Sequence, residues 1–393
     1  MRLFNTTSIE PSVHFFEHSR RPLPGNIMFN ALHLSESIML AVNPRVTIDV
    51  IKGVLRAAKD TRQIVILELA LSEMSIDKGY TGLTPSTFVE RVDRAAKKVG
   101  WYGYVLHADH ITVKKGTENE LEKVRQEINA RVNAGFSSYA IDTSFLFDRK
   151  ALNVKDQLKK VLETTIQLFE FIKERMGGKQ FAKEGEVGEI GITELTTAEE
   201  AIFFLEKLRE RGIDLDCLAI ANGSKHGVNV DAEGRIIPQL GINIERTVEI
   251  SKMMKSKGFK TGIAQHGITG TPFHLIESEF PKGPINKGNI GTFWMLLVWD
   301  LLQVFDPELY KTIFDWVTEE YRKTNVPKIK TFTNYSKYGI RVFFDELENL
   351  DRELRDAIQA KTYAETLMIF RAFGMRQTAK KVYDYIIKEE IDY

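Results

Sequence analysis

Short apolar runs alternate with longer amphipathic segments over most of the chain. The short runs are rich in β-branched residues and have the length of buried strands. We expect strands at residues 26–34, 63–71, 102–110, 137–144, 180–188, 217–226, 260–266 and 284–292.

The segments between these runs have the periodicity of amphipathic helices. We expect helices at residues 46–59, 85–99, 118–133, 155–176, 197–211, 243–257, 271–279 and 293–303. Alternation of strand and helix predicts a parallel sheet, and eight such units over roughly 280 residues match the size of a (β/α)8 TIM barrel. A doubly wound open sheet is the rival architecture, but it usually has a glycine-rich turn after its first strand. Here that turn has the sequence Leu34-Ser35-Glu36-Ser37, without glycine.

The last part of the chain has a different pattern, rich in Glu, Lys, Tyr and Phe. We expect helices at residues 306–323, 343–359 and 362–388 and no further strand. The predicted fold class is therefore α/β, a (β/α)8 barrel with an all-α C-terminal extension. The predicted domains are a catalytic barrel over residues 1–305 and a helical extension over residues 306–393, packed on the barrel or on a partner subunit.

Charge and composition exclude several classes of function. The chain has 54 Lys and Arg and 54 Asp and Glu residues, so its formal net charge is zero, and a nucleic-acid binder with a global basic field is not expected. A single cysteine, Cys217, excludes an intramolecular disulfide framework and a cysteine-rich zinc ribbon. No apolar run reaches the ~18 residues of a membrane span, and the first residues lack a signal-peptide core. We expect a soluble cytoplasmic protein that binds neither membrane nor nucleic acid.

Four of the eight histidines lie at the end of a predicted strand. They are His107, His110, His226 and His266, and a further strand end carries the carboxylates of residues 184–189. In a parallel barrel the C-terminal strand ends converge on the active site. Imidazoles that meet there from the third, sixth and seventh strands are a natural ligand set for a divalent metal with open positions. A lone histidine is more often a structural polar residue, but several at one end of a barrel favour a metal site.

Six motifs occur in one order along these strand ends. They are His107-Ala108-Asp109-His110, the stretch 136–142, Glu184-Gly185-Glu186-Val187-Gly188, the stretch 223–227 (Gly-Ser-Lys-His-Gly), the stretch 266–271 (His-Gly-Ile-Thr-Gly-Thr) and the stretch 287–292 (Lys-Gly-Asn-Ile-Gly-Thr). Their order and spacing resemble the class II, metal-dependent ketose-bisphosphate aldolases, which include fructose- and tagatose-bisphosphate enzymes. The resemblance covers roughly residues 25–300.

The resemblance implies a metal site. His110, His226 and His266 would hold a catalytic Zn²⁺, and Glu186 would be an alternative or adjacent ligand. Asp142 would lie behind the metal, where it orients ligands or binds a second ion. The three imidazoles also suit another divalent metal such as cobalt or iron, and a monovalent cation is an additional option.

The resemblance also implies two proton-transfer groups. Asp109 would handle the proton of the aldol hydroxyl, and Glu194 would move the proton of the enediolate, with Glu189 as the nearest competitor. This assignment is chemically coherent, because a divalent cation stabilises an enediolate as a Lewis acid while two carboxyl groups move the protons. Schiff-base chemistry is the alternative, but the residues around Lys183 and Lys287 mark neither as an amine with a depressed pKa.

Glycine-containing loops after the last strands predict phosphate binding, because backbone N–H groups and helix N-termini favour anions. The candidate substrate and phosphate ligands are Gly227, Gly267, Thr269, Asn289, Gly291 and Thr292. Three features depart from the family. Ile268 and Thr269 replace a Gly and a Ser of the usual phosphate loop, Gly291 stands where fructose-bisphosphate enzymes usually have Asp, and the loop after Glu194 is short.

These observations give one leading function and two alternatives. The leading one is a zinc-dependent aldolase, a lyase of carbohydrate metabolism such as glycolysis. It would cleave or form a ketose (bis)phosphate, fructose 1,6-bisphosphate or a stereoisomer, through dihydroxyacetone phosphate and an aldehyde such as glyceraldehyde 3-phosphate. The alternatives are a metal-dependent ketose (phosphate) epimerase and a non-catalytic relative that binds sugar phosphates. The Phe- and Tyr-rich C-terminal helices favour a homodimer or homotetramer.

Overall fold

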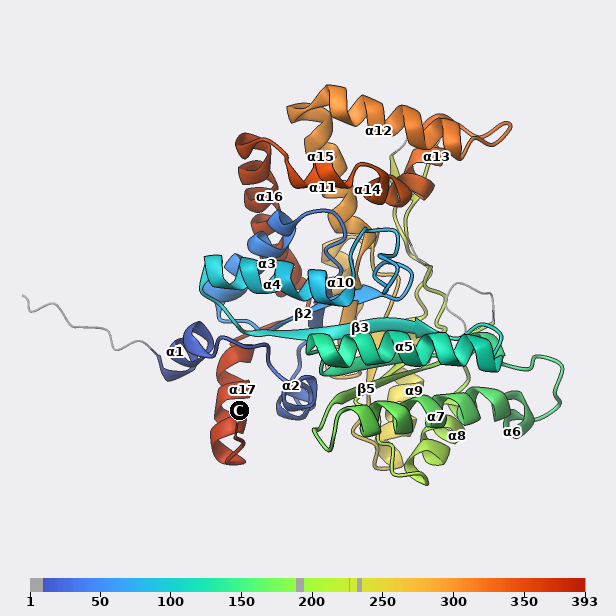
Figure 1. Cartoon of the computed structure of the whole chain (residues 1–393). Helices are drawn as coiled ribbons and strands as arrows, with labels where there is room; N and C mark the ends of the chain where they lie inside the picture. The colour runs from blue at the N-terminus through green and yellow to red at the C-terminus, as the bar shows by residue number, and fades with distance from the viewer. Residues whose placement is uncertain (1–9, 189–193, 226, 232–234, 393) are drawn as a thin grey trace, which may run out of the picture.

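A computed structural model describes residues 10–188, 194–225, 227–231 and 235–392 (Figure 1). Eight parallel strands close into a barrel in the order β1-β10-β9-β6-β5-β4-β3-β2. The strands are β1 (Met39–Val42), β2 (Val65–Ala70), β3 (Tyr104–Thr112), β4 (Ser138–Asp142), β5 (Ala182–Val187), β6 (Cys217–Ile220), β9 (Gly262–Gln265) and β10 (Ile285–Ile290). The barrel with its C-terminal helices confirms the predicted fold class. His226 and Glu189 lie outside the described residues.

The first predicted strand, residues 26–34, is wrong. This segment forms the helix α2 (Gly25–Leu32), whereas the strand is β1, which spans only four residues. The run looked like a strand because Ile27, Met28 and Phe29 are consecutive apolar residues, all of them buried. The segment is anchored beside the start of β3, because the backbone N–H of Leu23 donates to the carbonyl of Tyr104 at 2.7 Å.

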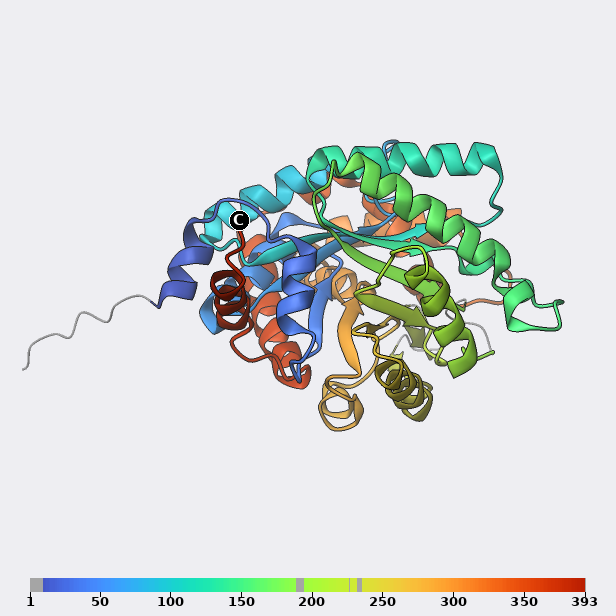
Figure 2. The ribbon, with the colours of Figure 1, turned by 90° about the horizontal axis from the view of Figure 1, so that it is seen from below.

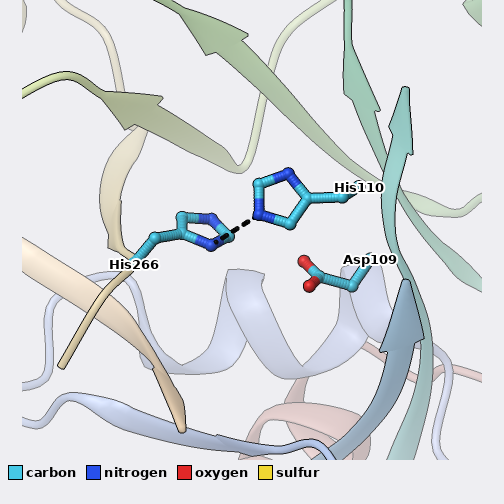
Figure 3. Close-up of side chains that lie close together, drawn as sticks. All are labelled: Asp109, His110 and His266. Carbon is cyan, nitrogen blue, oxygen red and sulfur yellow. Dashed lines mark hydrogen bonds between the residues drawn. The ribbon is translucent and has the colours of Figure 1, made fainter. Parts of the chain in front are cut away.

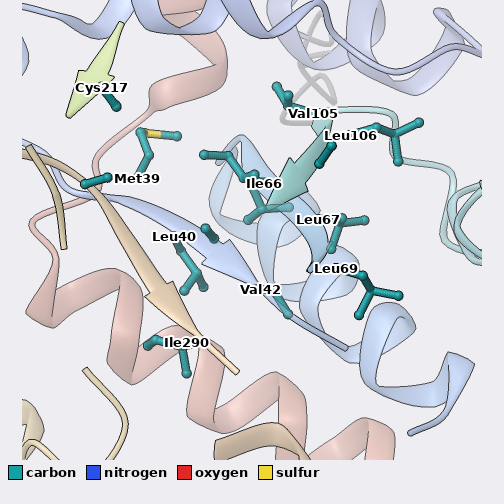
Figure 4. Packing of buried hydrophobic residues seen from close by; sticks show 14 of the residues in the cluster. Met39, Leu40, Val42, Ile66, Leu67, Leu69, Val105, Leu106, Cys217 and Ile290 are labelled. Atoms are coloured by element: carbon teal, nitrogen blue, oxygen red, sulfur yellow. The ribbon is translucent and has the colours of Figure 1, made fainter. Parts of the chain in front are cut away.

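Helices follow the strands and surround the barrel. They are α3 (Ile48–Thr61), α4 (Pro85–Val99), α5 (Glu118–Ala134), α6 (Val154–Gln157), α7 (Lys159–Arg175), α8 (Ala198–Arg209), α9 (Ile244–Ser256), α10 (Phe273–Glu279) and α11 (Thr292–Phe305). Thr47, Thr84, Thr117 and Thr197 cap the N-termini of α3, α4, α5 and α8 with their side-chain oxygens, which satisfies backbone N–H groups at each helix start. Apolar side chains of the strands fill the space under these helices (Figure 4).

The chain after residue 305 is helical. It contains α12 (Pro307–Glu320), α13 (Lys328–Tyr335), the 3₁₀ turn η2 (Ser336–Tyr338), α14 (Gly339–Val342), α15 (Phe344–Glu348), α16 (Arg352–Ala372) and α17 (Thr378–Lys388). The predicted helix break at 360–361 is wrong, because α16 continues through it. The chain turns instead after Ala372, where Gly374 and Gln377 have φ angles of 66° and 47°.

The C-terminal helices pack on the barrel at separate places. α16 lies along α3 and α11, and α17 lies beside α2 and the short N-terminal helix α1 (Pro11–His18) (Figures 1 and 2). α12 and α13 form the upper edge of the molecule in Figure 1. Among the described residues, no helix combines the length and the apolarity that crossing a membrane requires.

Candidate active site

A cavity of about 620 Å³ opens at the C-terminal ends of the barrel strands. Most of the residues singled out in the sequence line it, although they lie far apart in the chain. They are Asp109, His110, Asp142, Glu186, Gly227, His266, Gly267, Thr269, Asn289, Gly291 and Thr292. The fold therefore brings together the phosphate candidates, the described metal candidates and Asp109, one of the two acid–base candidates.

Two imidazoles face each other in this cavity (Figure 3). His110 Nε2 from β3 and His266 Nδ1 from the end of β9 are 3.0 Å apart, and the ring centroids are 4.4 Å apart. Asp109 points to the same place, and one ligand atom from each of the three residues lies within 4.8 Å of the others. We call His110 and His266 the imidazole pair.

A β-bulge in β3 allows Asp109 and its neighbour His110 to reach the cavity together. Ala108 pairs with Tyr139 of β4, but the next registered pair is Ile111 with Ile141, so β3 contains one extra residue. His110 has a φ angle of 38°, in the left-handed region that only a few per cent of non-glycine residues adopt. In a regular strand, successive side chains point to opposite faces. The bulge re-aims one of them, as bulges beside active sites often do.

Carboxylates lie behind both imidazoles. Glu186 Oε2 is 3.2 Å and Asp142 Oδ2 is 3.8 Å from His110 Nδ1. Glu184 Oε1 is 3.2 Å from His266 Nε2. Each imidazole thus directs one nitrogen to a carboxylate and the other to the shared space. A carboxylate that holds the distal N–H of a ligating histidine fixes its tautomer and orientation.

The ionisable side chains in the cavity have pKa values that are shifted in different directions. Burial tends to raise the pKa of Asp109, but His110 and Lys287 outweigh it and lower that pKa below its usual value. Burial tends to lower the pKa of His110, but Asp109 and Glu186 outweigh it and raise that pKa well above its usual value. Burial, with the nearby Asp142, raises the pKa of Glu186 to about 8. Asp109 is therefore ionised at neutral pH, as are Asp142 and Glu184, whose pKa values are also lowered below their usual values, against the effect of burial, by the nearby His110 and Lys287, respectively.

The geometry of the imidazole pair fits a divalent metal. Two nitrogens that each lie ~2.0–2.1 Å from a tetrahedral Zn²⁺ are about 3.3 Å apart, close to the separation seen here. Asp109 adds a carboxylate oxygen on the same side. Asp142 and Glu186, predicted as further or alternative ligands, form a second potential group with His110, within 4.8 Å of one another.

Sequence reasoning missed a second buried group, which we call the Lys287 cluster: Glu68, His107, Glu184 and Lys287. Lys287 Nζ lies 2.8 Å from Glu184 Oε2, 3.2 Å from Glu68 Oε2 and 2.9 Å from His107 Nε2. The sequence signal for the Lys287 cluster was a lone charged residue within an apolar strand, such as Glu68 within Val65–Ala70. A charge on a buried strand needs a partner inside the barrel.

The Lys287 cluster also bears on Schiff-base chemistry. Burial tends to lower the pKa of Lys287, but Glu184, Glu68 and Asp109 outweigh it and raise that pKa above its usual value. A Schiff-base lysine needs the opposite shift, because only the neutral amine is nucleophilic. Lys183, the other lysine considered, lies 4.9 Å from the centre of the Phe181 ring.

The structure places Glu194, the predicted mover of the enediolate proton, away from the cavity. Its side chain is 69% exposed and lies 3.4 Å from Arg149 Nε. It lines a separate small pocket with Phe147 and Thr196. Glu194 is thus not among the groups that the fold gathers around the imidazole pair. Neither His226, the third predicted imidazole ligand, nor Glu189 lies in the described part of the chain.

Comparisons with known proteins identify the family of the chain. The sequence profile described as "Fructose-bisphosphate aldolase class-II" matches residues 27–337. A 101-residue segment is 31% identical to the D-tagatose-1,6-bisphosphate aldolase subunit GatZ of Escherichia coli (strain SMS-3-5 / SECEC), covering 24% of each chain. The alignment therefore spans about a quarter of the length of this curated relative.

Solved structures share the fold. The YdjI aldolase from Escherichia coli K12 superposes with a TM-score of 0.57 at 16% identity, over 91% of this chain and 100% of the other. The fructuronate-tagaturonate epimerase UxaE from Cohnella laeviribosi gives a TM-score of 0.57 at 13% identity, over 93% and 83%. At such identities the likeness shows the barrel, and function has to be argued from the site itself.

Proposed function

Because the chain belongs to the class II fructose-bisphosphate aldolase family, we propose that it is a zinc-dependent aldolase that cleaves or forms a ketose phosphate. The reaction would connect the ketose phosphate with dihydroxyacetone phosphate and an aldehyde such as glyceraldehyde 3-phosphate. The observation that carries this proposal is the imidazole pair beside the ionised carboxylate of Asp109. We also propose a tagatose- or fructose-type bisphosphate as substrate, which the likeness to GatZ supports.

The residues have distinct roles in this proposal. His110 and His266 hold the cation, with His226 as the third expected ligand, and Glu186 and Glu184 orient the two imidazoles. A divalent cation, when bound there, would supply Lewis-acid stabilisation of an enediolate. Asp109 takes the proton from the aldol hydroxyl as the carbon–carbon bond breaks, and its lowered pKa keeps it ready as a base.

Other cavity residues bind the substrate in the proposal. Gly267 has a φ angle of 66°, and a Cβ there would lie 2.6 Å from the Lys225 carbonyl, so glycine is required for this loop to form. Gly267, Thr269 and Gly227 offer backbone N–H groups to a phosphate. Asn289 Nδ2 donates to Glu68 and Asp109 at 2.7 and 3.3 Å. In the described part of the chain its buried Oδ1 has no hydrogen-bond partner, so it is available to a substrate hydroxyl.

The experiment is an assay of the purified protein for metal and for triose-phosphate release from several ketose bisphosphates. We expect bound Zn²⁺ and cleavage activity, and we expect His266→Ala to lose the metal and at least about 10³-fold in turnover. His274→Ala is the control, because its side chain lies on α10 outside the lining of the cavity. Full activity in the presence of a strong chelator would contradict the proposal.

The same assay tests an epimerase on this barrel. The observation that favours it is the position of Glu194 outside the cavity, which leaves the proton transfers to the ionised carboxylates inside it, such as Asp109. Retro-aldol epimerisation breaks and remakes one carbon–carbon bond while the fragments stay bound. Formation of an epimeric ketose without free triose would therefore assign this reaction. We further propose a cytoplasmic homodimer or homotetramer, which sedimentation of the full chain tests.

A further inference from the structure

We propose that Gln239 is a positioning residue that fastens the loop after β6 to the glycine loop after β9, so that cation binding and phosphate binding strengthen each other. The inference rests on the proposed function and adds to it a residue that lies outside the cavity lining. The β6 loop is the segment between β6 and α9, residues 221–243, described except for 226 and 232–234. The glycine loop is residues 267–270, directly after β9 and its histidine.

Gln239 makes hydrogen bonds to both loops. Its side-chain Oε1 accepts from the backbone N–H of Lys225 at 3.0 Å, and its Nε2 donates to the carbonyl of Gly267. Its own backbone N–H donates to the carbonyl of Gly270 at 3.0 Å. One side-chain amide therefore bridges the β6 loop and the glycine loop, and a backbone hydrogen bond holds that residue in place.

A short antiparallel hairpin of the β6 loop carries Gln239 to the glycine loop. Its strands are β7 (Asn229–Val230) and β8 (Ile236–Ile237), and Gln239 follows β8 by two residues. A Cβ added at Gly270 would lie 3.6 Å from Val228 Cγ1, which is an ordinary van der Waals distance. The hairpin region thus packs against the glycine loop, and this packing brings the Gln239 amide within reach of it.

A second connection lies at the base of the two loops. The side chains of Asn222 and Gln265 are both buried and bond to each other. Asn222 Nδ2 donates to Gln265 Oε1 at 2.7 Å, and Gln265 Nε2 donates to Asn222 Oδ1 at 3.3 Å. The backbone N–H of Asn243 donates to the carbonyl of Asn222 at 2.7 Å, which closes the β6 loop at its ends. The buried amide pair therefore joins the loops where they leave the strands, and Gln239 joins them further along.

The hydrogen bonds of Gln239 act on the chain neighbours of two proposed cation ligands. Lys225 directly precedes His226 in the sequence, and Gly267 directly follows His266. In a trans peptide unit, the carbonyl and the next N–H point in opposite directions. The peptide unit after Gly267 is trans, so a bond that fixes the Gly267 carbonyl also fixes the direction of the following N–H.

The glycine loop keeps N–H groups for a ligand. Among the described residues, no hydrogen bond joins the backbone N–H of residue 268, 269 or 270 to another group. Thr269 and Gly267 line the cavity together with His266. Successive free N–H groups form an anion-binding concavity. A phosphate held there and a cation held by His266 would therefore both order the segment that Gln239 fastens.

The experiment replaces Gln239 by Met, which has a similar length and no amide group. Competition with a chromophoric chelator measures Zn²⁺ affinity, and calorimetry measures methyl phosphate affinity of the full chain with and without Zn²⁺. Methyl phosphate has no ketone or hydroxyl group with which to chelate the cation. We expect Gln239→Met to weaken Zn²⁺ binding about tenfold, the lower end of the range for residues that orient metal ligands.

The coupling between the two ligands is the readout that a merely structural role would not move. In the wild type we expect Zn²⁺ to tighten methyl phosphate binding at least about fivefold, and methyl phosphate to tighten Zn²⁺ binding by the same factor. In Gln239→Met we expect this factor to fall at least about twofold, because only the direct attraction between the two charges remains.

Gln157→Met is the matched control. Gln157 is a half-buried glutamine outside the cavity lining, and its Nε2 donates to the carbonyl of Ala151 at 3.1 Å. This variant loses a comparable hydrogen bond to a loop carbonyl, and we expect both affinities and their coupling to stay at the wild-type values. Thermal unfolding of each variant checks that the barrel remains folded.

Gln239→Glu is a second variant, which keeps one half of the bridge. Its carboxylate can accept from the Lys225 N–H but cannot donate to the Gly267 carbonyl. We expect the coupling factor to fall as in Gln239→Met, because the bridge needs both halves. An unchanged coupling factor in Gln239→Glu would overturn the proposal even if Gln239→Met does not fold.

These measurements separate the role of Gln239 from the proposed reaction, because none of them requires turnover. A Zn²⁺ affinity and a coupling factor in Gln239→Met equal to those of Gln157→Met would overturn the role of Gln239, even if the aldolase assay succeeds. Loss of both in Gln239→Met alone would support it, even if no aldol product forms.

Discussion

The Lys287 cluster and the imidazole pair each place histidine beside carboxylates within one barrel, yet their surroundings differ. Lys287 is fully buried and supplies the positive charge that Glu68 and Glu184 require. The imidazole pair faces the cavity, and the His110 side chain is 17% exposed. The first group has its cation built into the chain, whereas the second presents two nitrogens to a space that a cation can enter.

Similar side chains differ in protonation and accessibility because their neighbours differ. His107 accepts a hydrogen bond from Lys287 and directs Nδ1 to Ser138 Oγ at 2.6 Å, so both of its nitrogens are engaged. Burial, then Lys287, lowers its pKa well below the usual value, which keeps the ring neutral. His110 lies three residues further on, within the bulge, among carboxylates. Glu184 connects the Lys287 cluster with the imidazole pair, because its Oε2 contacts Lys287 and its Oε1 contacts His266.

The largest expected effect on stability comes from replacing Lys287, the buried cation of the Lys287 cluster. Lys287→Met leaves Glu68 and Glu184 buried without their counter-charge, so we expect the free energy of unfolding to fall by about 3–5 kcal/mol. Denaturant unfolding of the two proteins measures the change.

Lys183→Met is the control for this substitution. Lys183 is a half-buried lysine of β5, next to Glu184 in the sequence, and its Nζ lies over the Phe181 ring. We expect its effect to stay below about 1 kcal/mol. A Lys287→Met protein as stable as this control would remove the distinction between the two groups.

A smaller effect is expected from the carboxylates that orient the imidazoles. Glu186→Gln and Glu184→Gln should each weaken Zn²⁺ binding by about 10–100-fold, because each disturbs the tautomer or orientation of one imidazole. Only Glu184→Gln should also lower the unfolding free energy, because only Glu184 contacts Lys287. Competition with a chromophoric chelator measures the affinity. Unchanged affinity in both variants would show that these carboxylates do not support the imidazoles.

The smallest effect concerns a carboxylate outside both groups. Asp216, just before β6, accepts a hydrogen bond from the backbone N–H of Lys183 at 2.8 Å, and burial raises its pKa to about 6. Between pH 4 and pH 6 the folded state then binds this proton more tightly than the unfolded state. Its contribution to the unfolding free energy therefore decreases as pH rises through that window.

Replacing this carboxylate removes the pH dependence. Because Asp216 is partly exposed, we expect Asp216→Asn to gain only about 1 kcal/mol relative to the wild type between pH 4 and pH 7.5. Urea unfolding at both pH values measures the gain. Parallel curves for variant and wild type would mean that Asp216 titrates normally.

The sequence predicted the elements with strong periodicity and several of the groups at the strand ends. Residues 85–99 form α4 as expected, because Thr84 and Pro85 mark its start and Gly100 its end. The sequence did not predict β1, because this strand is four residues long and lacks a periodic signal. The apolar run in α2 has the pattern of a strand and was predicted as one. The sequence did not predict the Lys287 cluster, because its members come from β2, β3, β5 and β10 and meet only when the barrel closes.

The bulge in β3 links two duties that a regular strand would keep apart. Asp109 and His110 are sequence neighbours, and the extra residue lets both side chains enter the cavity. Deleting one residue here would restore alternation and turn one of the two away from the centre. A simple length change in β3 could therefore not remove Asp109, the proposed proton carrier, and keep His110, the proposed cation ligand, in the cavity. Loss of chemistry with retention of binding would have to arise by substitution, and Asp109 is where such a change would be found.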